Sequence, residues 1–212
     1  MASDPTVSRD GRELGHGGKL ARADLWRLEE YAVERKAFRA RVIAHKKLRR
    51  VALGPHATLL FEDFLTMKYQ VQEMLRIERI FEPAAIDEEL AAYNPLIPDG
   101  SNWKATFLIE YADPEERALA LARMPGVEHR VWFRIGAGER NFAHANDDME
   151  RTERDKTAAV HFLRFELTKE SAEAVRSGEE VRIGIDHPEL LSETPLSAST
   201  VASLAEDLDR TT

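Results

Sequence analysis

The sequence predicts an α+β protein in which a helical N-terminal half packs on a mixed, largely antiparallel five-stranded sheet. Up to about residue 98 the apolar residues recur with the helical period, and from Lys104 onward they alternate as in strands. The order of elements in the second half, β-α-β-β-β-α-β, is typical of a split βαβ sheet with one added strand. A chain of 212 residues, 43% of them hydrophobic, is long enough to bury a core.

The first half is predicted to form three helices and one short strand. The first 18 residues have no hydrophobic period, so we expect a flexible tail. Thr66 is the expected cap of the second helix, and the third helix ends before Asn94-Pro95, because the residue before a proline avoids helical angles. The predicted helices span residues 22–47, 66–81 and 83–93, and the short strand spans residues 57–61.

The second half is predicted to supply the sheet. Asp113-Pro114 is a strong helix start, with a capping carboxylate and a proline in the first turn, and Ser177-Gly178 is an equally plain stop. The predicted strands span residues 104–111, 129–135, 140–145, 158–167 and 180–186, and the helices span residues 113–123 and 169–177.

The expected domain organisation is one α+β domain between two tails. The domain covers residues 19–188, with a helical part at 19–98 and a sheet part at 99–188. Residues 189–212 are expected to form an acidic C-terminal tail with a short helix at 200–208.

Composition excludes several classes of protein. The chain has no cysteine, which removes disulfides, thiolate nucleophiles and clusters held by cysteine. No apolar run approaches the roughly 20 residues of a membrane helix, and the N-terminus lacks the hydrophobic stretch of a signal peptide. We therefore expect a cytoplasmic protein without membrane contact.

Charge is divided unevenly along the chain. The net charge is −8, yet residues 31–50 hold eight lysines and arginines against one acid, Glu34, so this segment carries about +7 and the rest about −15. Such a helix could bind an acidic protein, pack on the chain's own carboxylates, or bind nucleic acid; the last is least favoured, because aromatic residues are not interleaved with the cations. Arg41, Lys47 and Arg50 lie off the apolar face and are the predicted surface for a redox protein or a second copy.

One set of polar residues could bind an anion between the first two helices. Arg35 and Arg39 are four residues apart, so their guanidinium groups can reach the same place. Glu78 maps inside the apolar stripe of the second helix, where a carboxylate must be paired. Gln70 and Glu73 would complete a pocket. The alternative is a structural ion-pair network that holds the two helices in register.

A second set of residues could bind a metal ion. His144, His161 and His187 share the phase of apolar residues in their predicted strands, and Asp186 could add a carboxylate. Such a set would suit iron or zinc. No two histidines have tight ligand spacing, so hydrogen-bonded structural histidines are the alternative, and the sequence has no evident cofactor motif.

Several strings of this chain resemble the signature of one bacterial family. The strings are Leu53-Gly54-Pro55-His56, Phe61-Glu62-Asp63, Ala92-Tyr93-Asn94-Pro95-Leu96-Ile97-Pro98 and Gly184-Ile185-Asp186-His187-Pro188. They are similar to the family catalogued as domain of unknown function 3501, over about residues 19–188. The resemblance implies a redox or oxidative-stress setting, since members tend to be encoded beside a rubrerythrin-like protein and an iron–sulfur oxidoreductase. Neighbouring genes indicate a setting and no active site.

These observations predict a non-catalytic accessory or binding protein in a redox or stress system. The second hypothesis is a metal-dependent enzyme or sensor that uses His161, His187 and nearby acids. The third is a nucleic-acid binder that uses the basic helix. No residue is assigned a catalytic role.

Overall fold

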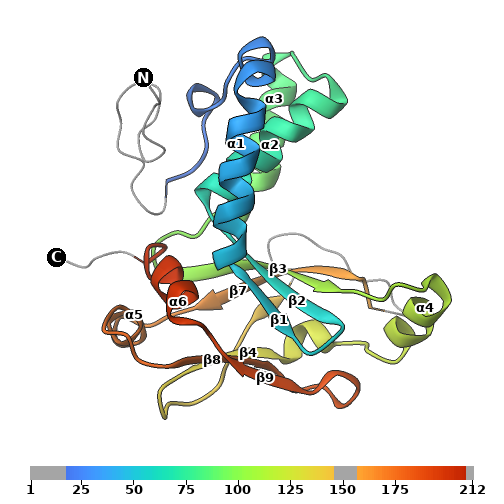
Figure 1. The fold of residues 1–212 in the computed structure, drawn as a ribbon, viewed down its shortest axis with the longest axis vertical. Coiled ribbons are helices and arrows are strands. Elements are labelled where there is room, and N and C mark those ends of the chain that lie inside the picture. The colour runs from blue at the N-terminus through green and yellow to red at the C-terminus, as the bar shows by residue number, and fades with distance from the viewer. Residues whose placement is uncertain (1–17, 146–156, 209–212) are drawn as a thin grey trace.

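A computed structural model describes residues 18–145 and 157–208 of the chain. Two β-sheets packed on each other form one part of the molecule, and three helices stand away from them (Figure 1). We call these helices, α1 (Leu28–Leu48), α2 (Phe64–Glu78) and α3 (Pro83–Tyr93), the helical projection, and the rest the sheet part. The predicted flexible tail, residues 1–18, lies outside the described residues except for Gly18.

The sheet part contains two antiparallel sheets. The first has the order β1-β2-β3-β7-β6 and the second the order β5-β4-β8-β9. The strand bounds are β1 Arg50–Leu53, β2 Ala57–Glu62, β3 Asn102–Ile109, β4 Val131–Ile135, β5 Asn141–Phe142, β6 His144–Ala145, β7 Val160–Glu166, β8 Val181–Ile185 and β9 Ser192–Pro195.

The predicted α+β class is confirmed, but the strands do not join one mixed five-stranded sheet. The predicted strand 140–145 is split between β5, which pairs with β4, and β6, which pairs with β7. At the bend between them, the backbone N–H of Ala143 donates to the carbonyl of Val131 at 2.8 Å. A strand that changes partner at a bend links two sheets instead of extending one.

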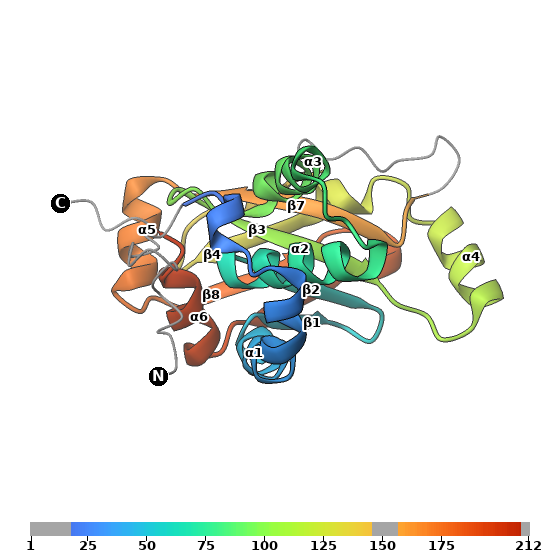
Figure 2. The ribbon, with the colours of Figure 1, turned by 90° about the horizontal axis from the view of Figure 1, so that it is seen from above.

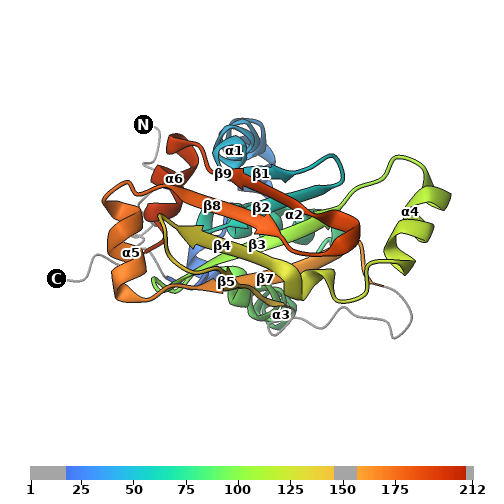
Figure 3. The ribbon, with the colours of Figure 1, turned by 90° about the horizontal axis from the view of Figure 1, so that it is seen from below.

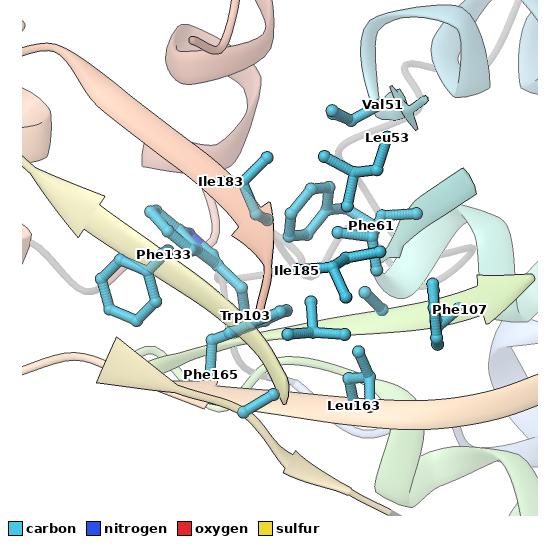
Figure 4. Close-up of a cluster of buried hydrophobic side chains, with 14 of the residues drawn as sticks. Val51, Leu53, Phe61, Trp103, Phe107, Phe133, Leu163, Phe165, Ile183 and Ile185 are labelled. Atoms are coloured by element: carbon cyan, nitrogen blue, oxygen red, sulfur yellow. The ribbon is translucent and has the colours of Figure 1, made fainter. Parts of the chain in front are cut away.

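The main core lies between the two sheets (Figure 4). Trp103 of β3 meets Phe133 of β4 edge to face at 5.4 Å, and Phe133 meets Phe165 of β7 at 5.9 Å. All three side chains are at most 1% exposed. Aromatic contacts across the sheets therefore hold them together, since such pairs add to the burial of their large apolar areas.

Three further helices lie around the sheets: α4 (Pro114–Ala122), α5 (Lys169–Arg176) and α6 (Ala198–Ala205). Figure 3 shows the four-stranded sheet from its outer side, with α5 and α6 toward one end and α4 toward the other. As predicted, Asp113 caps α4, its carboxylate accepting from the N–H groups of Glu115 and Glu116, and Gly178 follows α5 with a φ of 84°.

The C-terminal segment is part of the fold and not a tail. Strand β9 pairs with β8, and Leu204 and Leu208 are buried in the main core. The indole N–H of Trp103 donates to the carbonyl of Leu204 at 2.9 Å. The sequence concealed this role, because four-residue strands and eight-residue helices carry weak periodic signals.

The helical projection has small cores of its own. Helix α2 lies between α1 and α3 (Figure 2). It turns Met67, Val71 and Leu75 toward Leu90 of α3. On its other side, α1 buries an aromatic cluster in which Phe38 lies 4.8 Å from Trp26 and 5.8 Å from Tyr69. The projection thus packs mainly on itself.

Two predicted helix starts are corrected. Helix α1 begins at Leu28 instead of residue 22, because residues 22–24 form a separate 3-10 turn. Asp63, not Thr66, caps α2: its carboxylate accepts the N–H of Thr66 at 2.8 Å. No helix in the described ranges is long and apolar enough to span a membrane.

Candidate functional site

The predicted cluster between α1 and α2 is centred on Glu73. Arg35 donates to the carboxylate of Glu73 through Nε at 2.8 Å and Nη2 at 2.9 Å. The hydroxyl of buried Tyr31 donates to Oε1 at 2.7 Å, and Arg76 donates from one turn further along α2 at 3.2 Å. A planar guanidinium matches a carboxylate in this two-bond arrangement.

These donors strongly favour the ionised carboxylate of Glu73. The hydrogen bonds from Arg35, and then those from Tyr31 and Arg76, outweigh partial burial and lower the pKa of Glu73 to about 2. Burial and the adjacent Glu73 raise the pKa of Tyr31. The carboxylate therefore occupies the place that a bound anion would take at Arg35.

Glu78 does not take part in this cluster, contrary to the sequence prediction. It is exposed at the last residue of α2. The apolar stripe that packs on α3 ends with Leu75, and the chain then leaves the helix through Arg79, whose φ is 55°. A helical-wheel position predicts burial only while the helix still has a neighbour on that side. Gln70 is half-buried on α2, and Arg39 is exposed.

We call four arginines at α1 and the end of α2 the basic ridge: Arg39 and Arg35 of α1, Arg76 of α2, and Arg79, which directly follows α2. Arg39 lies one turn from Arg35 on α1, and Arg79 lies three residues beyond Arg76. Arg35 and Arg76 meet at Glu73 and still keep about a third or more of their side chains exposed. The ridge carries one internal carboxylate for four guanidinium groups, so its net charge is positive.

Gln72 is a buried polar residue of α2 that the sequence did not single out. It is 0% exposed. Its side-chain carbonyl accepts the backbone N–H of Trp26 at 2.7 Å, and its amide donates to the carbonyl of the same residue at 3.3 Å. Gln72 thus fixes the segment before α1 to α2.

A buried ionic network lies where the projection meets the sheet part. Arg49, only 1% exposed, donates to the carbonyls of Phe61, Glu62 and Ser203 at 3.0–3.1 Å and pairs with Asp207. Its Nε also lies 3.5 Å from the carboxylate of Asp63, which pairs with His45. Arg49 therefore ties the end of α1 to β2, to the start of α2 and to the segment after α6.

The pKa values of the two carboxylates in this network, Asp207 and Asp63, are shifted in opposite directions. Burial raises the pKa of Asp207 to about 7, although the charge of Arg49 opposes the shift. At Asp63, burial is outweighed by the charge of Arg49 and the hydrogen bond from His45, and the pKa falls to about 2. No local pattern in the sequence predicts this network, because Arg49 stands among three other cations in residues 46–50 and Asp207 lies 158 residues away.

The three histidines of the predicted metal site lie apart. His144 is exposed on β6, His161 is fully buried on β7, and His187 precedes a 3-10 turn, where its Nδ1 accepts the N–H of Glu189 at 3.3 Å. Asp186 pairs with Arg140 at 3.6 Å. Within residues 18–145 and 157–208, no three His, Asp or Glu side chains are grouped so that they could hold a metal ion.

His161 instead belongs to a buried hydrogen-bond cluster. Its Nε2 lies 2.8 Å from the hydroxyl of Thr157 and 4.0 Å from the carboxylate of Glu128, and each of these side chains is at most 2% exposed. Burial lowers the pKa of His161 and so favours the neutral ring, although the nearby carboxylate of Glu128 opposes this shift. This is the structural alternative that the sequence had left open.

The three predicted partner-surface residues differ in their surroundings. Lys47 is exposed, and Arg50 is exposed beside Glu110 at 3.6 Å. Arg41 lies over the ring of Phe38 at 5.1 Å, and burial lowers the pKa of its guanidinium group. The Arg41 side chain therefore packs on the aromatic cluster as well as carrying a charge.

Comparisons with known proteins agree with this fold and leave its activity open. A family model described as a protein of unknown function (DUF3501) matches residues 19–208. A crystal structure of a protein of unknown function from Burkholderia pseudomallei K96243 is 48% identical, with a TM-score of 0.86 over 91% of this chain and 100% of that chain. No curated protein matches the sequence significantly.

Proposed function

The chain belongs to the DUF3501 family of proteins of unknown function, and from the geometry of its projecting helices we propose that it is a non-catalytic accessory protein. In this proposal it binds an acidic protein partner through the basic ridge. The family resemblance, with its redox neighbours, suggests an electron-transfer or peroxide-handling protein as that partner.

The observation that carries this proposal is the placement of the basic ridge. It lies on helices that stand away from the sheets and are therefore accessible from several directions (Figure 1). The protein as a whole is acidic, with a net charge of −8. Opposite potentials on separate regions of one molecule orient an approaching partner and speed its association.

The internal ion pairs support a binding role over a catalytic one. Glu73 is held by three donors and Arg49 by carbonyls and carboxylates. Groups satisfied in this way position helices, because breaking such a pair leaves a buried charge without its partner. They leave the outward-facing arginines at the two ends of the ridge as the groups that would meet a ligand.

The test uses the purified rubrerythrin-like protein from the same genome as the partner and measures binding by calorimetry at several salt concentrations. The variant Arg39→Glu/Arg79→Glu reverses the two ends of the ridge and leaves Arg35 and Arg76 on Glu73. We expect at least about a tenfold loss of affinity for the variant and a steep salt dependence for the parent.

The matched control is Arg130→Glu/Lys169→Glu, which makes the same change of net charge at exposed positions of the sheet part. It should bind like the parent. Equal losses of affinity in the two variants would mean that net charge, and not the basic ridge, governs binding. Absence of binding at low salt would contradict the proposal for this partner. Titration with a single-stranded oligonucleotide in parallel tests the nucleic-acid alternative.

A further inference from the structure

Helix α1 has a second apolar face, which points away from the molecule. Three of its large hydrophobic side chains are exposed: Val33 is 78% exposed, Ile43 46% and Leu48 42%. Three exposed alanines lie between them: Ala37, Ala40 and Ala44. Mapped at 100° per residue, all six fall within an arc of roughly 140°, opposite the buried Tyr31, Phe38 and Val42. We call these six residues the outer face of α1.

No other described element covers this face. In the view from above, α1 lies at the rim of the molecule, with α2 and α3 on its inner side (Figure 2). The helix has 21 residues and is thus about 31 Å long. Because alanines leave little side-chain bulk at the middle of the face, another helix can approach it closely.

The charges of α1 indicate what would cover this face. Its acids, Glu29, Glu30 and Glu34, all lie within the first seven residues, and only cations follow, ending with Lys46 and Lys47 in the last turn. Two copies of α1 in parallel would place like charges together. Two antiparallel copies would place the acidic end of each against the basic end of the other, so α1 is its own electrostatic complement.

We propose that the outer face of α1 binds the same face of a second copy, as an antiparallel helix pair with a two-fold axis near Ala40. In this arrangement Glu34 of one copy faces the basic last turn of the other, and Val33 packs beside the aliphatic stem of Lys47 or beside Leu48. The proposal rests on the proposed role of the projection in binding, and it assigns one face of α1 to self-association while the basic ridge stays free for a different partner.

The first test is sedimentation equilibrium of the full chain. A single helix pair lies at the small end of specific interfaces, so we expect a dimer with a Kd of roughly 1–100 µM that weakens as salt rises. Ala40→Glu puts two carboxylates near the axis and should raise the dimer Kd at least about tenfold. Ala118→Glu, at an exposed position of α4, is the matched control and should dimerise like the parent.

The second test uses disulfide trapping. Because the chain has no cysteine, any cross-link must involve the introduced thiol. Ala40→Cys should form a disulfide-linked dimer under mild oxidation, whereas Ala118→Cys should not. A mixture of Val33→Cys and Leu48→Cys chains should give the mixed dimer in preference to either self-linked one. Disulfide geometry requires close Cβ atoms, so the cross-links report the register.

Three results would overturn the inference. The chain could remain monomeric at low salt at concentrations well above the expected Kd range. Ala40→Cys could cross-link no faster than Ala118→Cys. Self-linked Val33→Cys dimers could dominate, which would mean a parallel pair. The proposed function is judged separately, by partner binding to the monomeric Ala40→Glu variant, whose basic ridge is intact.

Discussion

The sheet part and the helical projection are stabilised by different means. Between the sheets, Trp103, Phe133 and Phe165 meet in an apolar core. In the projection, small clusters are supplemented by polar side chains that link segments one to one, such as Gln72 to Trp26 and Glu73 to Arg35. The stability of the sheet part should therefore be most sensitive to substitutions that change side-chain shape. The stability of the projection, and of its junction with the sheet part, should be most sensitive to substitutions that change charge.

The largest expected effect lies at the junction of the two regions. Arg49→Ala removes a guanidinium group that six described groups contact and leaves Asp207 buried without its cation. We expect a loss of about 3–5 kcal/mol in the free energy of unfolding, measured by urea denaturation. The exposed neighbour Arg50 is the control, and Arg50→Ala should cost less than about 1 kcal/mol. Equal costs would mean that the network does not join the two regions.

The same junction predicts a dependence of stability on pH. Asp207 has a pKa raised by burial to about 7 in the folded protein, above its unfolded value near 3.8, so the folded state binds the proton more tightly. The contribution of Asp207 to the free energy of unfolding is fully present below pH 3.8 and is lost as pH rises toward 7. Asp63, whose pKa is lowered to about 2, acts in the opposite sense. Its contribution to the free energy of unfolding is lost as pH falls below about 4.

Asp207→Asn isolates this effect. The variant cannot titrate, so its free energy of unfolding should vary less between pH 4 and 7 than that of the parent. Urea denaturation at several pH values measures the difference. An unchanged pH profile would mean that another group governs this range.

An intermediate effect is expected within the four-stranded sheet. A Cβ added at Gly184 would lie 2.4 Å from the indole of Trp132 and 2.6 Å from the carbonyl of Ser192. Gly184→Ala should therefore cost about 1–3 kcal/mol through overpacking, read out as a lower Tm. A Cβ added at Gly126 would meet nothing within 4 Å. Gly126→Ala should therefore lower the Tm only through the backbone strain of its φ of 83°. A cost at Gly126 above that at Gly184 would contradict this packing argument.

A smaller effect is expected within the projection, where two glutamates of α2 can be compared. Glu73→Gln weakens the bonds to Arg35, Tyr31 and Arg76 and should lower the free energy of unfolding by about 1–2 kcal/mol. Glu78→Gln changes an exposed side chain and should stay within about 0.5 kcal/mol. If Glu78 proved the costlier of the two, its exposed position at the end of α2 would be wrong.

The smallest expected effect concerns metal. Because His144, His161 and His187 lie apart, we expect elemental analysis of the purified protein to find well below one iron, zinc or manganese ion per chain. Added metal should leave the Tm unchanged. Near-stoichiometric metal that is lost in His161→Ala would restore the metal-dependent hypothesis.

Local sequence determined the elements whose signals lie within a few residues. The Asp113 cap, the stop at Gly178 and the alternation along β3, β7 and β8 were all predictable, because caps and strand faces depend on neighbours in the chain. The pairing of Arg35 with a glutamate of α2 was also predictable in kind, since a charge facing a neighbouring helix needs a partner.

Only the tertiary structure decided which residues meet across long distances. It selected Glu73 over Glu78, because the apolar stripe of α2 that packs on α3 ends at Leu75, before Glu78 is reached. It divided the strands between two sheets at Ala143 and drew the C-terminal segment into the core. It also buried Arg49 alone among its neighbouring cations, because Asp207 returns to that position from the far end of the chain. Charge and hydrophobic period are local properties of a sequence, whereas a buried ion pair depends on where two distant segments come together.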